Sequence, residues 1–339
     1  MEQGKQIRLT ASEMGELWGQ YMNDSASICM LTYFLEKAED TEIKPVIAHA
    51  LELSQAHVQK IAEILTEEKN VIPYGFKLDE DVDLTAPRLY PDSYALNFIN
   101  QMAQIGLTSY ATSLSLTSRS DLTGYFKECV RETMELYEMS KDLLLQKGLY
   151  QRPPNISDLE QIEYVKKQGF VWDIFGEKRP LSAIEIANLD ANIKRNALGI
   201  ATLIGFSQVA KSKDVTQFMM RGIEIAKQHI QSFGKKLGAE NLPVPMIRAD
   251  VTESTAHTFS DKLMMFYTTT LIGLSIGYYG TAIAQSPRID LGVMYNKLIL
   301  GIQKYLEDGG NIMIKNKWLE EPPLASNRKD LAQGNLSRC

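Results

Sequence analysis

The sequence contains little cysteine: Cys29, Cys129 and Cys339 are the three among 339 residues. They form no CxxC pair and leave an odd number, which argues against a disulfide framework and against a zinc finger. This cysteine usage fits a reducing, cytosolic compartment. The first ten residues, MEQGKQIRLT, lack the apolar run of a secretory signal, so we expect no such signal here.

Several motifs of known chemistry are also missing. The sequence has no GxGxxG, no Walker A loop, no GxSxG elbow and no HExxH. With only four histidines, the sequence offers few candidates for the histidine of a Ser-His-Asp arrangement. The net charge is −6 and no block of lysine or arginine is present, which argues against a general nucleic-acid binder.

The sequence does contain a long internal repeat. LTASEMGEL at 9–17 aligns with LSAIEIANL at 181–189, an offset of 181 − 9 = 172 residues. After a three-residue deletion the offset becomes 169, and RSDL (119–122) then pairs with RIDL (288–291). The chain is therefore one unit written twice. Recurring pairs are Phe34/Phe206, Glu52/Glu224, His57/His229, Pro73/Pro245, Asp92/Asp261 and Tyr110/Tyr279.

Each copy has the apolar periodicity of four helices. In the first copy we expect them at about 11–39, 43–69, 92–118 and 122–147, with a long, proline-containing connection at 72–91. Two long helices, a long crossover and two more long helices are typical of a ferritin-like four-helix bundle. The sequence thus predicts an all-α protein of two tandem ferritin-like bundles, each with a single crossover between its second and third helices.

The predicted boundaries follow from the repeat and from composition. We expect the first bundle at 1–154 and the second at 181–323. The segment 155–180 contains FVWDIF (170–175), which is too apolar for a free linker and is expected to dock on a bundle. Residues 324–339 form a polar tail that we expect to be frayed.

Most recurring polar residues are expected to set helix ends. Thr10/Glu13 and Ser182/Glu185 have the spacing of capping boxes. We expect Asp121 and Asp290 to be N-caps of the fourth helices. Asp92 and Asp261 are expected in the first turn of the third helices, where the helix dipole favours a carboxylate.

The recurring histidine raises the question of a metal site. A ferritin-type dimetal centre needs Glu-x-x-His on two of its helices, whereas here the spacing is Glu52-x-x-x-x-His57. Five helical steps separate two side chains by about 140°, so the pair cannot easily share one ion. We expect His57 on the flank of the apolar stripe and Glu52 pointing away from it.

One set of possible metal ligands in the first copy could still lie at the same height along the bundle axis. His57, Asp24, Glu132 and Cys29 are the candidates for a degenerate metal site, but the last three correspond to Asn196, Gly301 and Ala201 in the second copy. The third helices add no ligand, because 93–118 and 263–287 contain no charged residue. We therefore expect apolar or weakly polar inner walls in both bundles, and no bound cofactor, with a transition metal as the alternative.

The uncharged third helices allow two interpretations. Residues 263–284 are long enough to span a bilayer and contain a GxxxG motif. The equivalent helix contains four amide side chains that lipid would not tolerate, so we favour burial at the centre of the protein and no transmembrane insertion. Small residues would then allow close backbone approach: Gly106, Ser109, Gly277 and Gly280.

Taken with the repeat, several longer strings resemble a duplicated, ferritin-like family of undetermined role, found mainly in spore-forming bacteria and loosely labelled spore-coat-like. The resemblance implies the bundle fold and the duplication over nearly the whole chain, but no activity and no catalytic residues. The strings are YMNDS (21–25), YFLEK (33–37), LELSQAH (51–57), IGLTSY (105–110), GLYQRPP (148–154), FGEKRPL (175–181), GFSQVAKSK (205–213), FSDKLMMF (259–266), YGTAIA (279–284) and EDGGNIMIKNKWLEEPP (307–323).

Three functional hypotheses remain open. The first is a non-catalytic structural or interaction protein, cytoplasmic and spore- or stress-associated, in which bundle packs on bundle and copies of the chain form a homo-oligomer. The second is an iron- or manganese-binding protein with a degenerate site near His57. The third is a carrier of a lipid or small ligand, using an apolar cavity beside the third helices.

Overall fold

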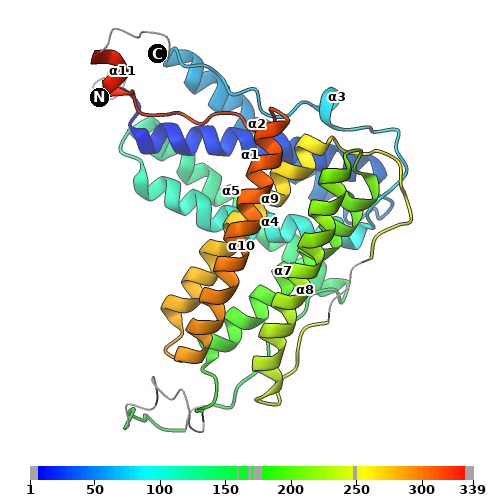
Figure 1. Cartoon of the computed structure of the whole chain (residues 1–339), viewed down its shortest axis with the longest axis vertical. Helices are drawn as coiled ribbons and strands as arrows, with labels where there is room; N and C mark the ends of the chain where they lie inside the picture. The colour runs from blue at the N-terminus through cyan, green and yellow to red at the C-terminus, as the bar shows by residue number, and fades with distance from the viewer. Residues whose placement is uncertain (1–6, 159, 167–169, 171–177, 247–249, 333–339) are drawn as a thin grey trace.

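The computed structural model describes residues 7–158, 160–166, 170, 178–246 and 250–332, and apart from one isolated β-bridge its regular structure there is helical (Figure 1). The all-α class and the internal repeat are therefore confirmed. In the described ranges each half has four long helices, and two short ones, α3 and α11, lie in the first long connection and after the last long helix. The helices are α1 (Ala11–Lys37), α2 (Lys44–Glu67), α3 (Leu78–Asp81), α4 (Asp92–Leu116), α5 (Ser120–Gln146), α7 (Ala183–Val209), α8 (Lys213–Gly238), α9 (Asp261–Gln285), α10 (Ile289–Lys315) and α11 (Arg328–Ala332).

Each half begins with the expected capping box. The Thr10 hydroxyl accepts a hydrogen bond from the Glu13 amide, and the Glu13 carboxylate accepts one from the Thr10 amide at 2.8 Å. Ser182 and Glu185 repeat this arrangement at the start of α7. Two orphan amides at each helix start are satisfied in this way.

The predicted N-caps of the fourth helices are wrong. Arg119 and Arg288 occupy the cap positions, and Asp121 and Asp290 lie inside the first turn. Each aspartate pairs with the arginine two residues before it, because the guanidinium offers a bidentate partner that a cap position does not.

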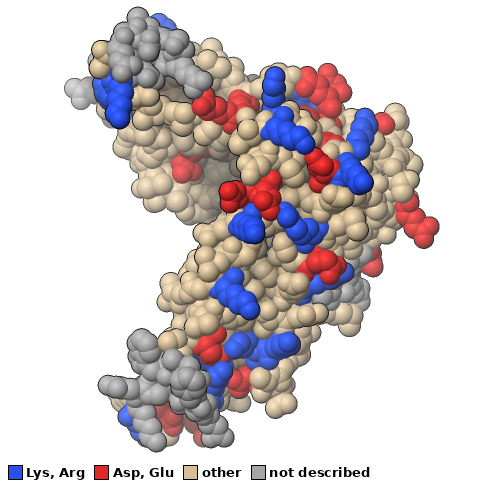
Figure 2. Space-filling model, viewed as in Figure 1, with Lys and Arg blue, Asp and Glu red and all other residues tan. Residues whose placement is uncertain are grey.

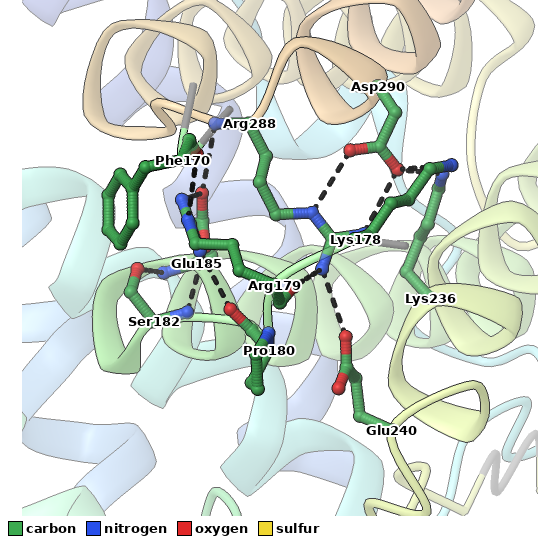
Figure 3. A network of polar contacts seen from close by, with 10 residues as sticks. All are labelled: Phe170, Lys178, Arg179, Pro180, Ser182, Glu185, Lys236, Glu240, Arg288 and Asp290. Carbon is green, nitrogen blue, oxygen red and sulfur yellow. Dashed lines mark hydrogen bonds and ion pairs between the residues drawn. The ribbon is translucent and has the colours of Figure 1, made fainter. Parts of the chain in front are cut away.

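Around each arginine, a charged network closes one end of its half, and Figure 3 shows the network of the second half. In the second half, Arg288 donates to Asp290 and Glu240, and its backbone amide donates to Glu185 at 3.2 Å. Burial alone would raise the pKa of Asp290, but Arg288 and Lys236 hold it well below its ordinary value. This network ties together the ends of α7, α8 and α10.

The first half repeats this network with Arg119, Asp121, Glu68 and Glu13. The guanidinium pairs with Glu68 at the end of α2, and the Arg119 amide donates to Glu13 at the start of α1. The recurring RSDL and RIDL strings are therefore explained by fold stability.

Asp92 and Asp261 lie in the first turns of α4 and α9, as predicted. They also make a contact that the sequence did not indicate. Asp92 accepts from the Glu39 and Asp40 amides at 3.0 and 2.7 Å, and Asp261 accepts from the Lys211 and Ser212 amides at 3.0 and 2.8 Å. Each aspartate thus fastens the turn between the first two helices to the third helix.

The long connections of the two halves pair with each other. The Asp83 amide donates to the Thr258 carbonyl, and the Thr252 amide donates to the Leu89 carbonyl, both at 2.9 Å. The 169-residue offset carries Asp83 to Thr252 and Leu89 to Thr258, so the two hydrogen bonds are copies of each other (252 − 83 = 169). The halves therefore pack about an internal two-fold axis, as the subunits of a symmetric dimer do.

Side chains follow the same axis. Phe98 in α4 and Tyr267 in α9 are equivalent residues, and their ring centroids lie 6.0 Å apart. Tyr33 packs edge-on against Phe259 at 4.9 Å. At the position equivalent to Tyr33, a Cβ on Gly205 would lie 2.3 Å from the Tyr90 hydroxyl, so only glycine fits there. The predicted packing of one half against the other is confirmed, and in Figure 1 the long helices of the two halves cross steeply.

The third helices show only part of the expected close packing. A Cβ on Gly106 would meet the Thr133 methyl group at 2.9 Å, so this glycine does permit a close approach. Gly277 and Gly280 face open space, with nothing within 4 Å, and the expectation is wrong for them. Within the described ranges, no helix has the length and apolar character needed to cross a membrane.

Little of the expected docked linker and tail falls within the described residues. Of FVWDIF, only Phe170 is described; its ring stacks under the Arg179 guanidinium at 4.1 Å, and 171–175 lie outside the described residues. Ile162 and Tyr164 are exposed. In the polar tail, α11 is helical, and residues 333–339 lie outside the described ranges.

Candidate functional site

A buried cluster of charged side chains surrounds His57 in the first half. The Nδ1 atom of His57 lies 3.2 Å from Oδ2 of Asp24 in α1, and the Nε2 atom of His57 lies 3.2 Å from Oε2 of Glu132 in α5. His57 and Asp24 are 5% and 6% exposed. The expectation of apolar or weakly polar inner walls is therefore wrong for this half.

Asp24 and Cys129 set the charge of the imidazole. Burial alone would lower the pKa of His57, but hydrogen bonds to Asp24 and Cys129 and the charge of Asp24 raise it to about 11. The ring is therefore protonated at neutral pH and donates from both nitrogens. A histidine in this state has no free nitrogen to act as a base, and it releases its proton far above neutral pH.

The geometry does not suit a metal ion. The carboxylates bind opposite ring nitrogens, so one ion cannot contact all three groups unless side chains move. Metal coordination would also require the imidazole to lose a proton. In the described part of the chain, no group of three or more histidine, cysteine, aspartate or glutamate side chains is placed to hold a metal ion.

The structure brings together three of the predicted candidates, His57, Asp24 and Glu132, and leaves the fourth apart. Cys29 is buried beside the long connection, where burial and then Asp81 raise the pKa of its thiol to about 12. The cysteine next to His57 is Cys129 in α5, whose sulfur accepts from Gln20 Nε2 at 3.8 Å.

Sequence reasoning also missed Tyr110 at this site. The Tyr110 ring lies edge-on to His57, with centroids 5.7 Å apart, and its burial raises the pKa of its hydroxyl well above the ordinary value. One signal was present in the sequence: Tyr110 and His57 are both repeated in the second copy, as Tyr279 and His229.

His57 lines a cavity of about 300 Å³ in the first half. The carboxylates of Glu16 and Asp24 also line it, and α9 of the second half closes one side. Oε1 of Gln20, another lining residue, is buried without a hydrogen-bond partner among the described residues. The cluster thus sets two acidic side chains, Asp24 and Glu132, against one protonated histidine, and Glu16 adds a further acidic side chain to the cavity wall.

The second half replaces the acids at the equivalent histidine. His229 Nδ1 lies 2.9 Å from the Tyr279 hydroxyl, which accepts from Asn196 Nδ2, also at 2.9 Å. Asn196 stands where the first half has Asp24, and Gly301 stands where it has Glu132. Burial lowers the pKa of His229 to about 4, so this ring is neutral at neutral pH.

A second cavity, of about 100 Å³, lies beside His229. The two cavities are related by the internal axis. Helix α9 closes the first cavity and α4 closes the second, and the lining residues of the two helices are equivalent in the repeat. The residues from α9 are Tyr267, Thr270, Leu271 and Leu274, and those from α4 are Phe98, Gln101, Met102 and Ile105. A third hollow, of about 640 Å³, lies where α4 meets α7.

Comparisons with known proteins identify a family and one distant structure. A family model described as a protein of unknown function, DUF3231, matches residues 1–162 and again residues 169–331. A solved structure from Bacillus halodurans, of a protein provisionally named a spore coat protein, is 16% identical. The match covers 44% of this chain and 98% of that one, with a TM-score of 0.42. No curated protein matches the sequence.

Proposed function

Because the chain belongs to the DUF3231 family, whose function is unknown, we propose a function from the chemistry of its interior. The protein is a non-catalytic binding protein, and the cavity beside His57 takes a small organic cation. One observation carries this proposal: the cavity wall is acidic, because it contains the carboxyl groups of Asp24 and Glu16 and a single imidazolium, His57, which also pairs with Glu132 outside the lining.

The state of the histidines supports a non-catalytic role. Acid–base catalysis is most effective when the pKa of the group lies near the working pH. The pKa values of His57 and His229, about 11 and about 4, both lie far from neutrality. Both rings also have hydrogen-bond partners inside the protein, as structural histidines do.

The experiment uses n-hexylammonium as the probe and hexan-1-ol as its neutral analogue, titrated calorimetrically into the full chain. We expect hexylammonium to bind and the alcohol to bind at least about tenfold more weakly, since a charge-assisted hydrogen bond is lost. Glu16→Gln keeps the shape of the side chain and removes its charge, so it should weaken the amine alone. Equal binding of amine and alcohol would contradict the proposal.

A second candidate is a degenerate iron or manganese site, since His57, Asp24 and Glu132 lie together, although these side chains would have to rearrange to hold one ion. Elemental analysis of tag-free protein decides it: stoichiometric transition metal that is lost in His57→Ala would support the site. Protein free of transition metal after purification in metal-supplemented buffer would remove it.

The finer architecture belongs to this proposal as well. We assign each half the ferritin-like, single-crossover topology, which the long connections after α2 and α8 support. We place the boundaries at 1–154, 155–180, 181–323 and 324–339. Cysteine usage supports the cytosol, and the sequence resemblance supports a link to sporulation. Acidic and basic side chains are interspersed over the face in Figure 2, in keeping with a protein that binds no nucleic acid.

A further inference from the structure

Arg195 in α7 lines the second cavity without an acidic partner. Its guanidinium carbon lies 3.7 Å from the centroid of the Tyr278 ring, and its Nη1 donates to Asn192 Oδ1 at 3.2 Å. Among the described residues it forms no ion pair. Burial is the largest influence on this side chain and lowers the pKa of Arg195. A guanidinium in such surroundings favours an anion beside it.

Two donors at this cavity have no acceptor. Nε of Arg195 and Nε2 of Gln101 are buried and lack hydrogen-bond partners in the described part of the chain. Both residues line the second cavity. Buried donors are nearly always satisfied in folded proteins, so a group that accepts hydrogen bonds is expected between them. A carboxylate fits a guanidinium fork in size and planarity.

The rest of the cavity wall selects an apolar tail. Most of it is aliphatic or aromatic, including Leu198, Ile225 and Ile272. The volume of about 100 Å³ is about two thirds of a cavity of about 150 Å³ that holds the six carbons of benzene, which limits the enclosed part of the tail to about four carbons. Multiply charged anions are disfavoured by such walls.

We propose that the second cavity binds a short-chain monocarboxylate, with its carboxylate on Arg195 and Gln101 and its tail among Leu198, Ile225 and Ile272. The inference rests on the proposed binding function only in treating the cavities as ligand sites. It concerns a different cavity and the opposite charge. Asn23 holds the place of Arg195 in the first half, so the repeat itself does not require an arginine here.

Calorimetric titration of hexanoate into the full chain tests the charge, with hexanamide as the uncharged analogue. We expect hexanoate to bind at least about tenfold more tightly than hexanamide, and Arg195→Met to abolish this preference. Arg195→Met should also raise the melting temperature, because it removes a buried charge that lacks a partner. Asn23→Met, at the equivalent position of the first half, is the matched control and should leave hexanoate binding unchanged.

A second pair of variants tests the location. Gly199 lines the cavity and a Cβ there meets nothing within 4 Å, so Gly199→Leu should fill the space and block hexanoate, while Gly199→Ala should not. The proposal is overturned if wild-type protein fails to bind hexanoate, if hexanamide binds equally well, or if Arg195→Met or Gly199→Leu binds as wild type does. Hexylammonium titrated into the same samples reports on the first cavity, so failure of the two proposals can be told apart.

Discussion

His57 and His229 hold equivalent positions in the two halves but are surrounded by opposite chemistry. His57 lies between two carboxylates and is protonated, whereas His229 contacts the Tyr279 hydroxyl and is neutral. The change from Asp24 to Asn196 and from Glu132 to Gly301 accounts for the difference. The comparison teaches that duplication kept the scaffold and the histidine while the charge of the interior diverged.

The cavities next to these histidines differ in the same way. The first is larger and is lined by acidic side chains together with Gln20, whose Oε1 has no hydrogen-bond donor among the described residues. The second is smaller and offers donors on Arg195 and Gln101 that find no acceptor in the described part of the chain. Two pockets related by one axis are therefore suited to ligands of opposite charge.

The largest expected effect comes from removing the acid partner of His57. Asp24→Ala leaves a buried imidazolium with Glu132 as its remaining carboxylate partner and one ring N–H unpaired, so we expect the free energy of unfolding to fall by about 3 kcal/mol. Asn196→Ala, the matched change in the second half, removes two neutral hydrogen bonds, to the Asn192 carbonyl and the Tyr279 hydroxyl, and should cost less, about 1 to 2 kcal/mol. Urea denaturation with hydrogen exchange of α2 and α8 measures both. Equal losses would break the comparison.

Transplanting the acids into the second half sharpens the comparison. In Asn196→Asp/Gly301→Glu, the carboxylates should raise the pKa of His229 from about 4 to above its ordinary value of 6.5. Gly301 has room for the new side chain, since nothing lies within 4 Å of its Cβ position. Gly301→Glu alone should move the pKa less. A pKa that stays near 4 in the double variant, followed by NMR titration, would show that the acids do not set the charge state.

The pH dependence of stability should run in opposite directions for the two histidines. The pKa of His57 is raised in the folded state, so its contribution is complete below pH 6.5 and is lost as the pH rises toward 11. The pKa of His229 is lowered, so its contribution is present above pH 6.5 and is lost as the pH falls toward 4.

Two variants test this pH dependence. His57→Gln should reduce the loss of unfolding free energy above neutral pH, and His229→Gln should reduce the loss below it. Urea denaturation on both sides of neutrality measures these slopes for wild type and variants. If either variant keeps the wild-type slope on its own side, that histidine does not titrate as described.

The smallest effect concerns the glycines of the third helices. Gly277→Ala should stabilise the protein by up to about 1 kcal/mol, because it adds helix propensity in open space. Gly106→Ala should bring a net loss of about 1 kcal/mol, since its methyl group meets Thr133 and overpacking exceeds the helix gain. Thermal denaturation compares the two. Equal stabilisation by both would show that α4 does not pack as tightly as the structure indicates.

Local signals in the sequence predicted the helices well. Capping boxes and apolar periodicity placed the ends of α1 and α7, and the aspartates of the third helices lie in the expected first turns. The fourth-helix caps failed because an arginine before each aspartate competes with the backbone for its carboxylate. The repeat predicted two halves, but it did not predict which apolar faces would meet across the axis. Both faces of each third helix are uncharged, so the sequence does not distinguish them.

The site could be predicted only in part. Helix periodicity shows which side of a helix a residue lies on, but not its height along the bundle relative to residues of other helices. Cys29 lies five residues after Asp24, which separates them by about 140° around the helix and about 7.5 Å along it. Cys129 comes from a different helix, and its level depends on how α5 slides against α2. Tyr110 could have been found from the sequence, because both Tyr110 and His57 recur in the second copy, as Tyr279 and His229.

NMR of the imidazole nitrogens tests the central claim most directly, since the chain has only four histidines to assign. At pH 8 we expect His57 to carry protons on both ring nitrogens, while at pH 6 His229 stays singly protonated. Two rings that titrate together near their ordinary pKa of 6.5 would contradict the account, because the halves would then share one interior chemistry.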